Sequence, residues 1–286
     1  MQNITHRTKD GNIVKIQCYT RLNSTVELAR EYAERGYPDR YAVMCEYENN
    51  KENDEHGLYM SCILRPSIFP AQAGLLTALA TAALAEGLEL HTRKRIGIGW
   101  VNSIYCEGKQ IGSVSIEGKL DDFKTYEYII VSFVAKLSSE DFPNRLTDLM
   151  KTVFEADNMS VVTLVAKDVL NKFFPFYITM RSNPKQFMSS YRQKFILNGV
   201  KIKYISDGKR ESARVVGLNT EICTLKIQRK NGEEIEVSSP TKVVIPKSIR
   251  LPSQKRAKQL LEKKEKEATE NDQKKDEKET AKAAAK

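Results

Sequence analysis

One segment in the middle of the chain carries residue types that could line a small-molecule site. Its sequence is Ile98-Gly99-Trp100-Val101-Asn102-Ser103-Ile104-Tyr105, followed by Gly108-Lys109-Gln110-Ile111 and Ile116-Glu117. Trp100, the only tryptophan, can form an apolar wall, Asn102 offers an amide, and Lys109 can contact a carboxylate or a phosphate. Each also has a simpler use, because turn asparagines often bond their own backbone and turn lysines are usually solvated. The pattern predicts two strands joined by a turn at Glu107-Gly108.

No second set of residues forms a catalytic pattern. The serines lack the Gly-x-Ser-x-Gly context of a nucleophile, and the three histidines show no His-x-x-x-His spacing. The five cysteines are odd in number and contain no Cys-x-x-Cys pair, so we expect buried thiols in a reducing compartment. The sequence therefore leaves the catalytic residues unknown and predicts no metal site.

The net charge of +9 does not by itself indicate a nucleic-acid-binding protein. Residues 255–286 hold 11 basic and 8 acidic side chains, which accounts for +3 of the total. The remaining +6 is spread along the body without a basic stripe interleaved with aromatics. No apolar run reaches the roughly 20 residues that cross a bilayer, and the first residues lack the apolar core of a signal peptide. We therefore expect a cytoplasmic protein without a specific nucleic-acid or membrane partner.

Apolar periodicity predicts strands and helices over most of the chain. Asn23-Ser24-Thr25 is typical of a helix start, because its side-chain oxygens can accept the unpaired amide protons of the first turn. Predicted strands cover residues 12–19, 41–47, 58–64 and 126–137. Predicted helices cover residues 26–36, 70–87, 141–155, 161–174 and 185–196. The helix over 70–87 is rich in alanine and is expected to be buried.

A change of composition at Asn198-Gly199 opens a second predicted unit. Short predicted strands at 200–204, 213–218, 224–228 and 234–237 are separated by turn signals, of which Asn231-Gly232 is the strongest. Such closely spaced short strands suggest a small SH3-like barrel. Beyond Pro252 the chain is rich in Lys and Glu and too poor in apolar residues to form a core, so we expect a disordered tail.

The segment around Trp100 resembles the centre of the catalytic domain of the biotin protein ligases. That family has Lys-Trp-Pro-Asn-Asp-Ile, a Gly-Lys-Lys turn, and a strand that ends in Gly-Ile-Leu-Ile-Glu. The residues that fit are Trp100, Asn102, Ile104, Gly108, Lys109, Ile111, Ile116 and Glu117. The family's lysine, proline and aspartate are replaced by Gly99, Val101 and Ser103.

Further fragments extend the resemblance from about Ile13 to about Ile245 and keep the family's order. They are Leu22-Asn23-Ser24-Thr25, Gly57-Leu58-Tyr59-Met60-Ser61, Leu64-Arg65-Pro66, Phe142-Pro143, Tyr191-Arg192 and Asn198-Gly199-Val200. The first is similar to the Asp-Ser-Thr-Asn that caps the family's first helix, and the second to its Gly-Asn-Leu-Tyr-x-Ser strand. Each fragment is short, so the resemblance depends on their order and spacing.

The resemblance implies an α+β fold. A biotin/lipoate-ligase-like catalytic domain, a mixed sheet with flanking helices, would cover residues 1–197, an SH3-like domain 198–250 and a charged tail 251–286. The family joins biotin to ATP as biotinyl-5′-adenylate and transfers the acyl group to a lysine of a carrier domain. An active protein would therefore bind biotin, ATP and Mg²⁺ and act on a biotin carboxyl carrier or other acyl-carrier domain, and the fold permits a homodimer. The ligand-binding candidates are Ser24, Thr25, Arg65, Trp100, Asn102, Lys109, Gly112 and Ser113.

The phosphate-facing chemistry of the family is replaced in this sequence. The family covers the adenylate with a Gly-Arg-Gly-Arg loop, but the stretch between Met44 and Gly57 has neither glycine nor arginine and holds five acidic residues. Like charges close to a triphosphate repel by kilocalories when partly desolvated. Ser113 replaces a glycine on the biotin side, and bulky Phe133 is expected to intrude where the family's Gly-Ile-Asn strand makes room. Lys94 and Arg95 lie close enough in sequence to substitute for the missing lysine.

Three hypotheses follow from these departures. The first is a ligase-fold protein that has lost or weakened biotin adenylation and serves as a binding or interaction module. The second is an active biotin or acyl ligase with a diverged loop, and the third is a transferase that takes an already activated acyl group without ATP. A repressor role is not expected, because the dozen residues before the first predicted strand are too few for a helix-turn-helix domain.

Overall fold

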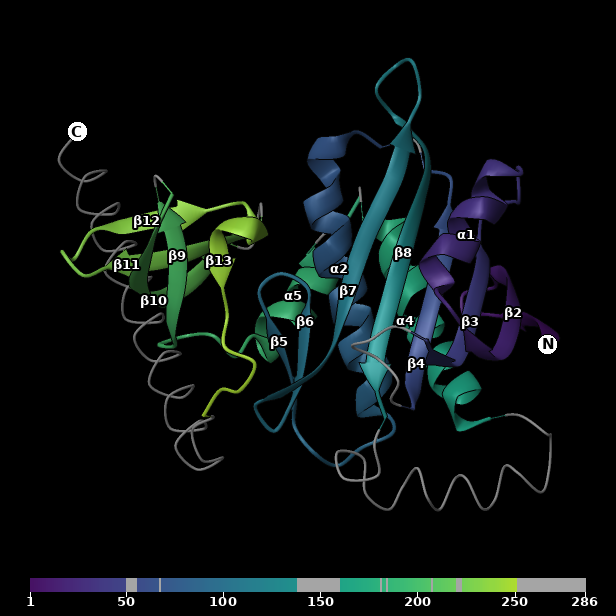
Figure 1. The fold of residues 1–286 in the computed structure, drawn as a ribbon, viewed down its shortest axis with the longest axis horizontal. Coiled ribbons are helices and arrows are strands. Elements are labelled where there is room, and N and C mark those ends of the chain that lie inside the picture. The colour runs from purple at the N-terminus through teal and green to yellow at the C-terminus, as the bar shows by residue number, and fades with distance from the viewer. Residues whose placement is uncertain are drawn as a thin grey trace, which may run out of the picture. The chain divides into compact units, whose positions relative to one another are not determined.

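A mixed sheet of eight strands forms the centre of the computed structural model, which describes residues 1–49, 56–66, 68–137, 160–180, 182–183, 185–206, 208–219 and 223–250. The strand order is β1-β2-β3-β4-β8-β7-β6-β5 (Figure 1). The bounds are β1 Gln2–Arg7, β2 Ile13–Leu22, β3 Tyr41–Glu48, β4 Gly57–Leu64, β5 Ile96–Gly99, β6 Ser103–Cys106, β7 Lys109–Leu120 and β8 Tyr126–Lys136. Of these pairs only β2 and β3 run parallel, because helix α1, Thr25–Glu34, connects them as a crossover.

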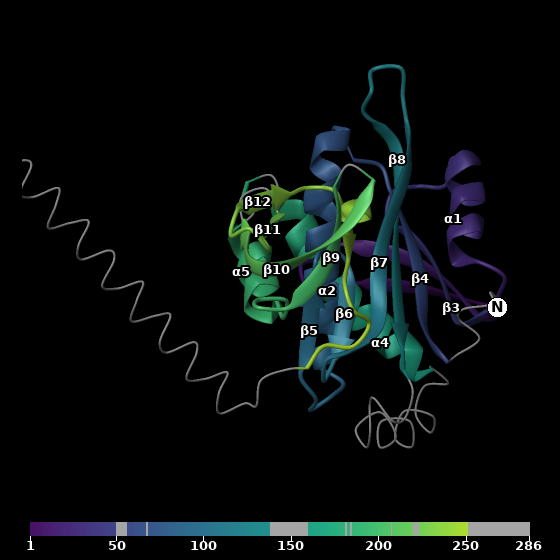
Figure 2. The ribbon, with the colours of Figure 1, turned by 60° about the vertical axis from the view of Figure 1, so that its left-hand side comes forward.

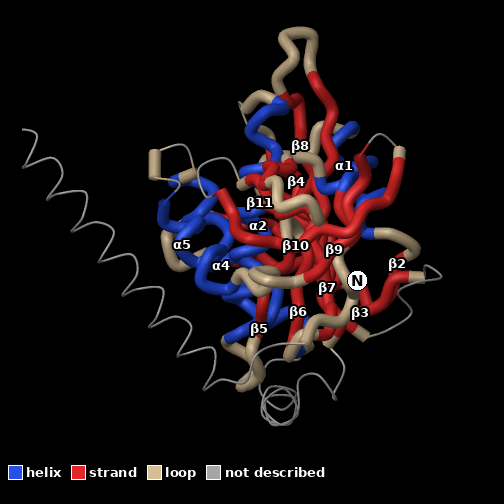
Figure 3. The backbone as a smooth tube through the Cα atoms, turned by 90° about the vertical axis from the view of Figure 1, so that its left-hand side faces the viewer, coloured by secondary structure: helices blue, strands red, loops and turns tan. Residues whose placement is uncertain are grey.

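Helices cover both faces of this sheet. Helix α1 packs against β3, β4 and β8 on one face. Helices α2, Ala73–Glu89, and α4, Val161–Thr179, pack against each other and against the opposite face, and α5, Lys185–Lys194, contacts α2 (Figure 2 and Figure 3). The predicted mixed sheet with flanking helices is therefore present. Within the described residues, no helix is both long enough and apolar enough to cross a membrane.

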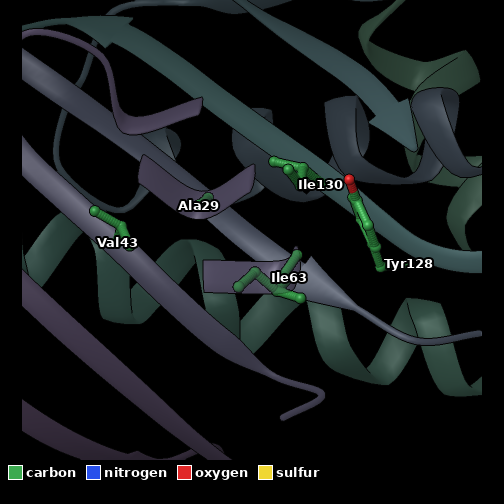
Figure 4. Close-up of a cluster of buried hydrophobic side chains, with 6 residues drawn as sticks. Ala29, Val43, Ile63, Tyr128 and Ile130 are labelled. Atoms are coloured by element: carbon green, nitrogen blue, oxygen red, sulfur yellow. The ribbon is translucent and has the colours of Figure 1, made fainter. Parts of the chain in front are cut away.

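An aromatic-rich apolar cluster fixes α1 on its face of the sheet (Figure 4). Its buried members are Ala29, Ala33, Val43, Ile63, Tyr128 and Ile130. The rings of Tyr32 and Tyr37 stack with centroids 4.4 Å apart, and Tyr41 meets Tyr37 edge-on at 4.9 Å. Small alanines on the helix and bulky residues on the strands let the two elements approach closely.

The second sheet has five antiparallel strands in the order β12-β11-β10-β9-β13. The bounds are β9 Lys201–Ser206, β10 Lys209–Asn219, β11 Thr224–Arg229, β12 Glu234–Val237 and β13 Val243–Val244. The four predicted strands are confirmed, and Gly232 adopts the positive φ that the predicted Asn231-Gly232 turn requires. The SH3-like barrel and the boundary at residue 198 stay predictions, and the tail lies outside the described residues.

Three elements differ from the predictions. Strand β1 was not predicted; it pairs with β2 over its whole length. The predicted continuous strand through Trp100 is two strands, β5 and β6, because the chain reverses at residues 100–102, where the Trp100-Val101 peptide is cis. Helix α4 continues through Pro175 to Thr179, since burial of Phe176 offsets the one lost backbone hydrogen bond. The helix predicted over 141–155 lies outside the described residues.

Helix α2 is buried, as predicted, and crosses α4 at a glycine. A Cβ placed on Gly87 would lie 2.8 Å from the Cα and 2.9 Å from the backbone nitrogen of Val169. Backbone atoms cannot move aside as a flexible side chain can, so this crossing requires glycine. In contrast, a Cβ on Gly74 in the same helix would meet no atom within 4 Å.

The substitution Gly87→Ala is therefore expected to lower the free energy of unfolding by about 1–3 kcal/mol through overpacking at α4. The matched substitution Gly74→Ala should raise it by about 0.5–1 kcal/mol, because alanine is the better helix former. Urea unfolding of both variants measures the two effects. Equal changes in the two variants would contradict the close crossing.

Candidate functional site

Four polar side chains form a buried hydrogen-bonded chain at the start of α1. Ser132 on β8 lies 2.9 Å from the hydroxyl of Ser61 on β4, and Ser61 donates to Thr25 Oγ1 at 3.0 Å. Thr25 donates in turn to the carboxylate of Glu48, with Oγ1 at 2.8 Å and the backbone nitrogen at 2.6 Å from Oε1. All four residues are buried, Glu48 at 6% exposure. We call this set the Glu48 chain.

The direction of the hydrogen bonds in the Glu48 chain follows from its carboxylate end. An ionised carboxylate only accepts, so Thr25 must donate to Glu48 and Ser61 to Thr25. Ser61 then has no proton left for Ser132, which becomes the donor at the far end. A chain aligned toward one charge strengthens each bond in it and removes the cost of burying the hydroxyls.

The strand register explains why these residues meet. Leu22 lies opposite Glu48 in the parallel pair of β2 and β3, so the first residues of α1 emerge directly beside the end of β3. Asn49 then donates its backbone N–H to the Leu22 carbonyl at 2.9 Å. Ser24 caps the helix by accepting from the Glu27 N–H at 3.2 Å, as predicted. Thus Glu48 satisfies one of the unpaired amides at the start of α1 and Ser24 satisfies another.

Small hydroxyl residues continue from the Glu48 chain toward the turn at residues 100–102. Ser115 on β7 lies opposite Ser132, and Ser113 lies opposite Ser103 on β6. Residues opposite each other or two apart in a strand share one face of a sheet, so all of these hydroxyls belong to the face that α1 covers. Ser113 and Ser103 are half-buried and Ser115 is exposed. We call this strip the hydroxyl row; it contains one predicted ligand-binding position, Ser113, and begins beside another, Thr25.

Gly99 stands at the position of the family's lysine, and the ring of Tyr105 lies where a side chain at residue 99 would begin. A Cβ placed on Gly99 would lie 2.8 Å from Cε2 of the Tyr105 ring. That ring is buried, and its hydroxyl donates to the Pro246 carbonyl at 2.8 Å. A side chain at residue 99 therefore requires the Tyr105 ring to shift.

Trp100 and Asn102 use their polar atoms within the fold. The Trp100 indole is 2% exposed and donates through Nε1 to the Cys223 carbonyl at 2.8 Å, which joins the turn to the second sheet. Asn102 donates from Nδ2 to the Val114 carbonyl at 2.8 Å. The backbone carbonyl of Asn102 accepts from the backbone N–H of Val114. Ligand roles for these two residues stay predictions. The structure shows each side chain bonded to a backbone carbonyl of the chain.

Two other candidates lie away from the hydroxyl row. Lys109 is exposed at the start of β7, beside Ser248 and next to the Glu107-Gly108 turn. Arg95 donates its backbone N–H to the Glu107 side chain, so the basic pair of residues 94 and 95 also lies at this end of β5 and β6. The missing lysine belongs at the opposite end of the same strands, which the register of Gly99 with Ser103 defines.

Gly112 has a structural reason to be glycine. A Cβ there would lie 2.2 Å from the Val134 carbonyl oxygen on β8. The close approach of β7 to β8 therefore excludes any side chain, whether or not a ligand is bound. Its neighbour Ser113 faces Ser103 and stays available to the hydroxyl row.

Phe133 does not intrude on this face, and that prediction is wrong. Its side chain is buried on the other face of the sheet, where its ring meets Phe173 of α4 at 5.4 Å between centroids. Successive residues in a strand point to opposite faces, and Ser132 takes the α1 side. The prediction failed because the sequence alone does not tell which residues of β8 point to which face of the sheet.

The predicted acidic loop is partly strand. β3 continues to Glu48, so Glu46 and Glu48 are strand residues, and residues 50–55 lie outside the described part. A hydrogen bond from His56 holds the pKa of the Glu46 carboxyl below its ordinary value. Sequence reasoning missed the role of Glu48. A signal for it was present. Glu48 ends β3, which runs parallel to β2, and β2 leads directly into the Ser24 cap of α1.

The cysteines match the expectation of unpaired thiols. All five are free, four of them buried and Cys18 half-buried. Burial raises the pKa of Cys18 to about 11 and those of Cys45 and Cys223 to about 12, so thiolate chemistry is disfavoured. In the part of the chain that the structure describes, no three His, Cys, Asp or Glu residues gather as metal ligands would.

Arg65 bonds backbone carbonyls at the far end of α1. Its guanidinium donates to the carbonyls of Ala33 at 2.7 Å, Tyr37 at 3.0 Å and Glu127 at 3.4 Å. Ala33 is in the last turn of α1, whose carbonyls lack intrahelical partners. The ten-residue helix is about 15 Å long, so Arg65 is remote from Ser24 and Thr25. The structure thus shows Arg65 capping α1 rather than lining the hydroxyl row.

Comparison with known proteins agrees with this architecture. No protein-family model matches the chain. The bifunctional ligase/repressor BirA of Bacillus spizizenii is 25% identical over 150 residues, which are 49% of this chain and 46% of that protein. BirA of Bacillus subtilis is 26% identical over 145 residues, 47% of this chain and 45% of that protein. The chain is therefore similar in sequence, at low identity, to these ligase/repressor proteins.

Solved structures show the same fold at low identity. Biotin protein ligase from Aquifex aeolicus superposes with a TM-score of 0.60 at 20% identity, covering 82% of this chain and 98% of that one. A biotin protein ligase-like protein of unknown function from Silicibacter sp. gives a TM-score of 0.57 at 13% identity, covering 81% and 97%. The predicted α+β ligase-like fold is confirmed at this level. The chain spans about half the length of the curated relatives it matches.

Replacing Arg65 by alanine is expected to lower the free energy of unfolding by about 2–3 kcal/mol, because three carbonyls lose a charged donor. Arg65→Lys should recover less than half of this loss, since an ammonium cannot reach all three carbonyls. Arg35→Ala is the matched control at the same end of α1: it removes an exposed pair with Glu31 and should cost at most about 0.5 kcal/mol. Urea unfolding measures the free energies of unfolding of the three variants. An unchanged value for Arg65→Ala would show that the bonds of Arg65 to these carbonyls do not stabilise the fold.

Proposed function

We propose that this protein is a biotin-ligase-like binding or interaction module in which ATP-dependent adenylation is lost or greatly weakened. The observation that carries the proposal is the buried Glu48 carboxylate at the first residue of α1. In a related active enzyme, donors at the ligand face would stabilise an anionic adenylate. Here one such donor, the Thr25 N–H, is already used by an internal anion.

Electrostatics oppose a second anion at the same place. A phosphate or carboxylate brought next to Glu48 would meet a like charge in a buried setting, where repulsion is screened far less than in water. The positive end of α1 can stabilise one negative charge, and Glu48 supplies it. The hydroxyl row remains able to bind neutral groups that donate or accept hydrogen bonds.

The glycine at the family's lysine position supports the same proposal. The Tyr105 ring occupies the space that a side chain at residue 99 would enter, so no cation can approach from there without rearrangement. Removal of one such charged or oxyanion-stabilising group typically lowers turnover by about 10²–10³. Loss of both the cation and the open helix start accounts for a protein that keeps the fold without the reaction.

An active ligase remains the alternative that the similarity to BirA favours. Its substrates would be biotin and ATP, both of which are bound in a structure of the Aquifex aeolicus ligase. In either case the partner class that the resemblance implies is a biotin carboxyl carrier or other acyl-carrier domain. A homodimer and a cytoplasmic location belong to the same set of proposals.

Incubation with ATP, Mg²⁺, labelled biotin and a biotin carboxyl carrier domain tests the proposal directly. We expect labelled carrier at a rate at least about 10³ lower than with a biotin protein ligase assayed in parallel. Calorimetry with a biotinyl-adenylate analogue should likewise show no tight binding. Efficient labelling or tight adenylate binding would refute the proposal and establish the active ligase. Transfer from octanoyl carrier protein without ATP would instead establish the acyltransferase.

A further inference from the structure

The second sheet presents a basic surface that the linear sequence does not reveal. Lys201 and Lys203 are exposed on β9, and Arg210 and Arg214 are exposed on β10. The two strands are neighbours in the sheet. We call these four residues the basic face.

The register places all four side chains on one side of the sheet. Arg214 lies directly opposite Lys201, Ser212 opposite Lys203, and Arg210 opposite Ile205. Directly opposed residues share a face and alternate residues along a strand share it too, so the four cations form two columns. The opposite side of the same strands holds the buried core, including Ile202 and Tyr204.

The cations of the basic face are not neutralised by carboxylates of the described residues. Lys203 donates to the Ser212 hydroxyl at 2.7 Å, and Arg214 donates to the Gly199 carbonyl at 2.7 Å. The acidic residue of β10, Glu211, lies on the opposite side of the sheet, where it accepts from the Tyr204 hydroxyl and pairs with Arg229. Like charges opposed across two strands repel, so this arrangement costs stability unless a partner compensates it.

The rest of the sheet limits where an anion would bind. Towards β12 the exposed side chains become mixed, since Lys226 lies opposite Glu236 and 3.6 Å from its carboxylate. The positive potential is therefore strongest over β9 and β10. Val216 and Val244, 37% and 46% exposed, add apolar contact beside it.

We infer that the basic face binds an acidic polypeptide segment in an extended conformation. Extended peptides repeat side chains on one side about every 7 Å, the same spacing as Lys201 and Lys203 along β9. Single-stranded nucleic acid is less well matched, because its binding proteins stack bases on aromatic side chains. Among the described residues that share the basic face, none is aromatic. The inference holds whether or not adenylation survives.

Binding of a fluorescent peptide of about twelve residues that alternates Glu and Ser tests the inference, with the Gln-Ser peptide as the neutral comparison. The full-length protein should bind the acidic peptide at low salt at least about tenfold more tightly than the neutral one. Affinity should fall as ionic strength rises, because the attraction is electrostatic. The double variant Lys201→Ser/Arg214→Ser should weaken binding at least about fivefold.

The matched control is Lys15→Ser/Arg93→Ser, which removes two exposed cations outside the second sheet and should leave the affinity within about twofold. Thermal unfolding of both double variants verifies that they fold. Equal binding of the Glu-Ser and Gln-Ser peptides would overturn the inference, as would equal losses in the two double variants. Tighter binding of an oligothymidylate of the same length would overturn it in favour of nucleic acid.

Discussion

The hydrogen bonds from Thr25 to the buried Glu48 carboxylate are the constraint on which this face of the sheet depends. They fix the start of α1 against the end of β3, and through Ser61 and Ser132 they connect that point to β4 and β8. A buried carboxylate is tolerated only where several donors converge on it, and here an amide, a hydroxyl and the helix dipole do so. The same bonds occupy the Thr25 amide and hydroxyl at the start of the helix. Under the proposed function they therefore both stabilise this corner and oppose the binding of an adenylate.

The turn at residues 100–102 is also held by contacts within the chain. In this chain the turn is part of the attachment of the second sheet, since Trp100 donates to Cys223 and Tyr105 to Pro246. The backbone pair of Gln110 with Lys247 and that of Ile249 with Gly108 extend the attachment along β7 and its turn. Gly99 keeps the space that the Tyr105 ring needs. Residues that resemble a ligand-binding motif therefore form contacts between the first sheet and the segments next to the second sheet.

The sequence predicts the elements better than it predicts the site. Helix α1 with its Ser24 cap, the strands β3, β4 and β8, and the four strands of the second sheet follow from local pattern, because capping and alternation are local properties. The side-chain partners do not follow, since they depend on register between distant strands. Phe133 was placed on the wrong face for this reason, and the bonds of Arg65 to the end of α1 were not foreseen. Glu48 was counted as loop charge, although the parallel register with Leu22 buries it.

A double-mutant cycle between Thr25→Val and Glu48→Gln tests most directly whether the Glu48 chain organises this face. Each variant keeps the shape of its side chain while removing the hydroxyl or the charge. If the buried bond is present, urea unfolding should give a coupling energy of about 1–3 kcal/mol between the two positions. Additive effects, with a coupling near zero, would contradict a buried carboxylate bound to the start of α1.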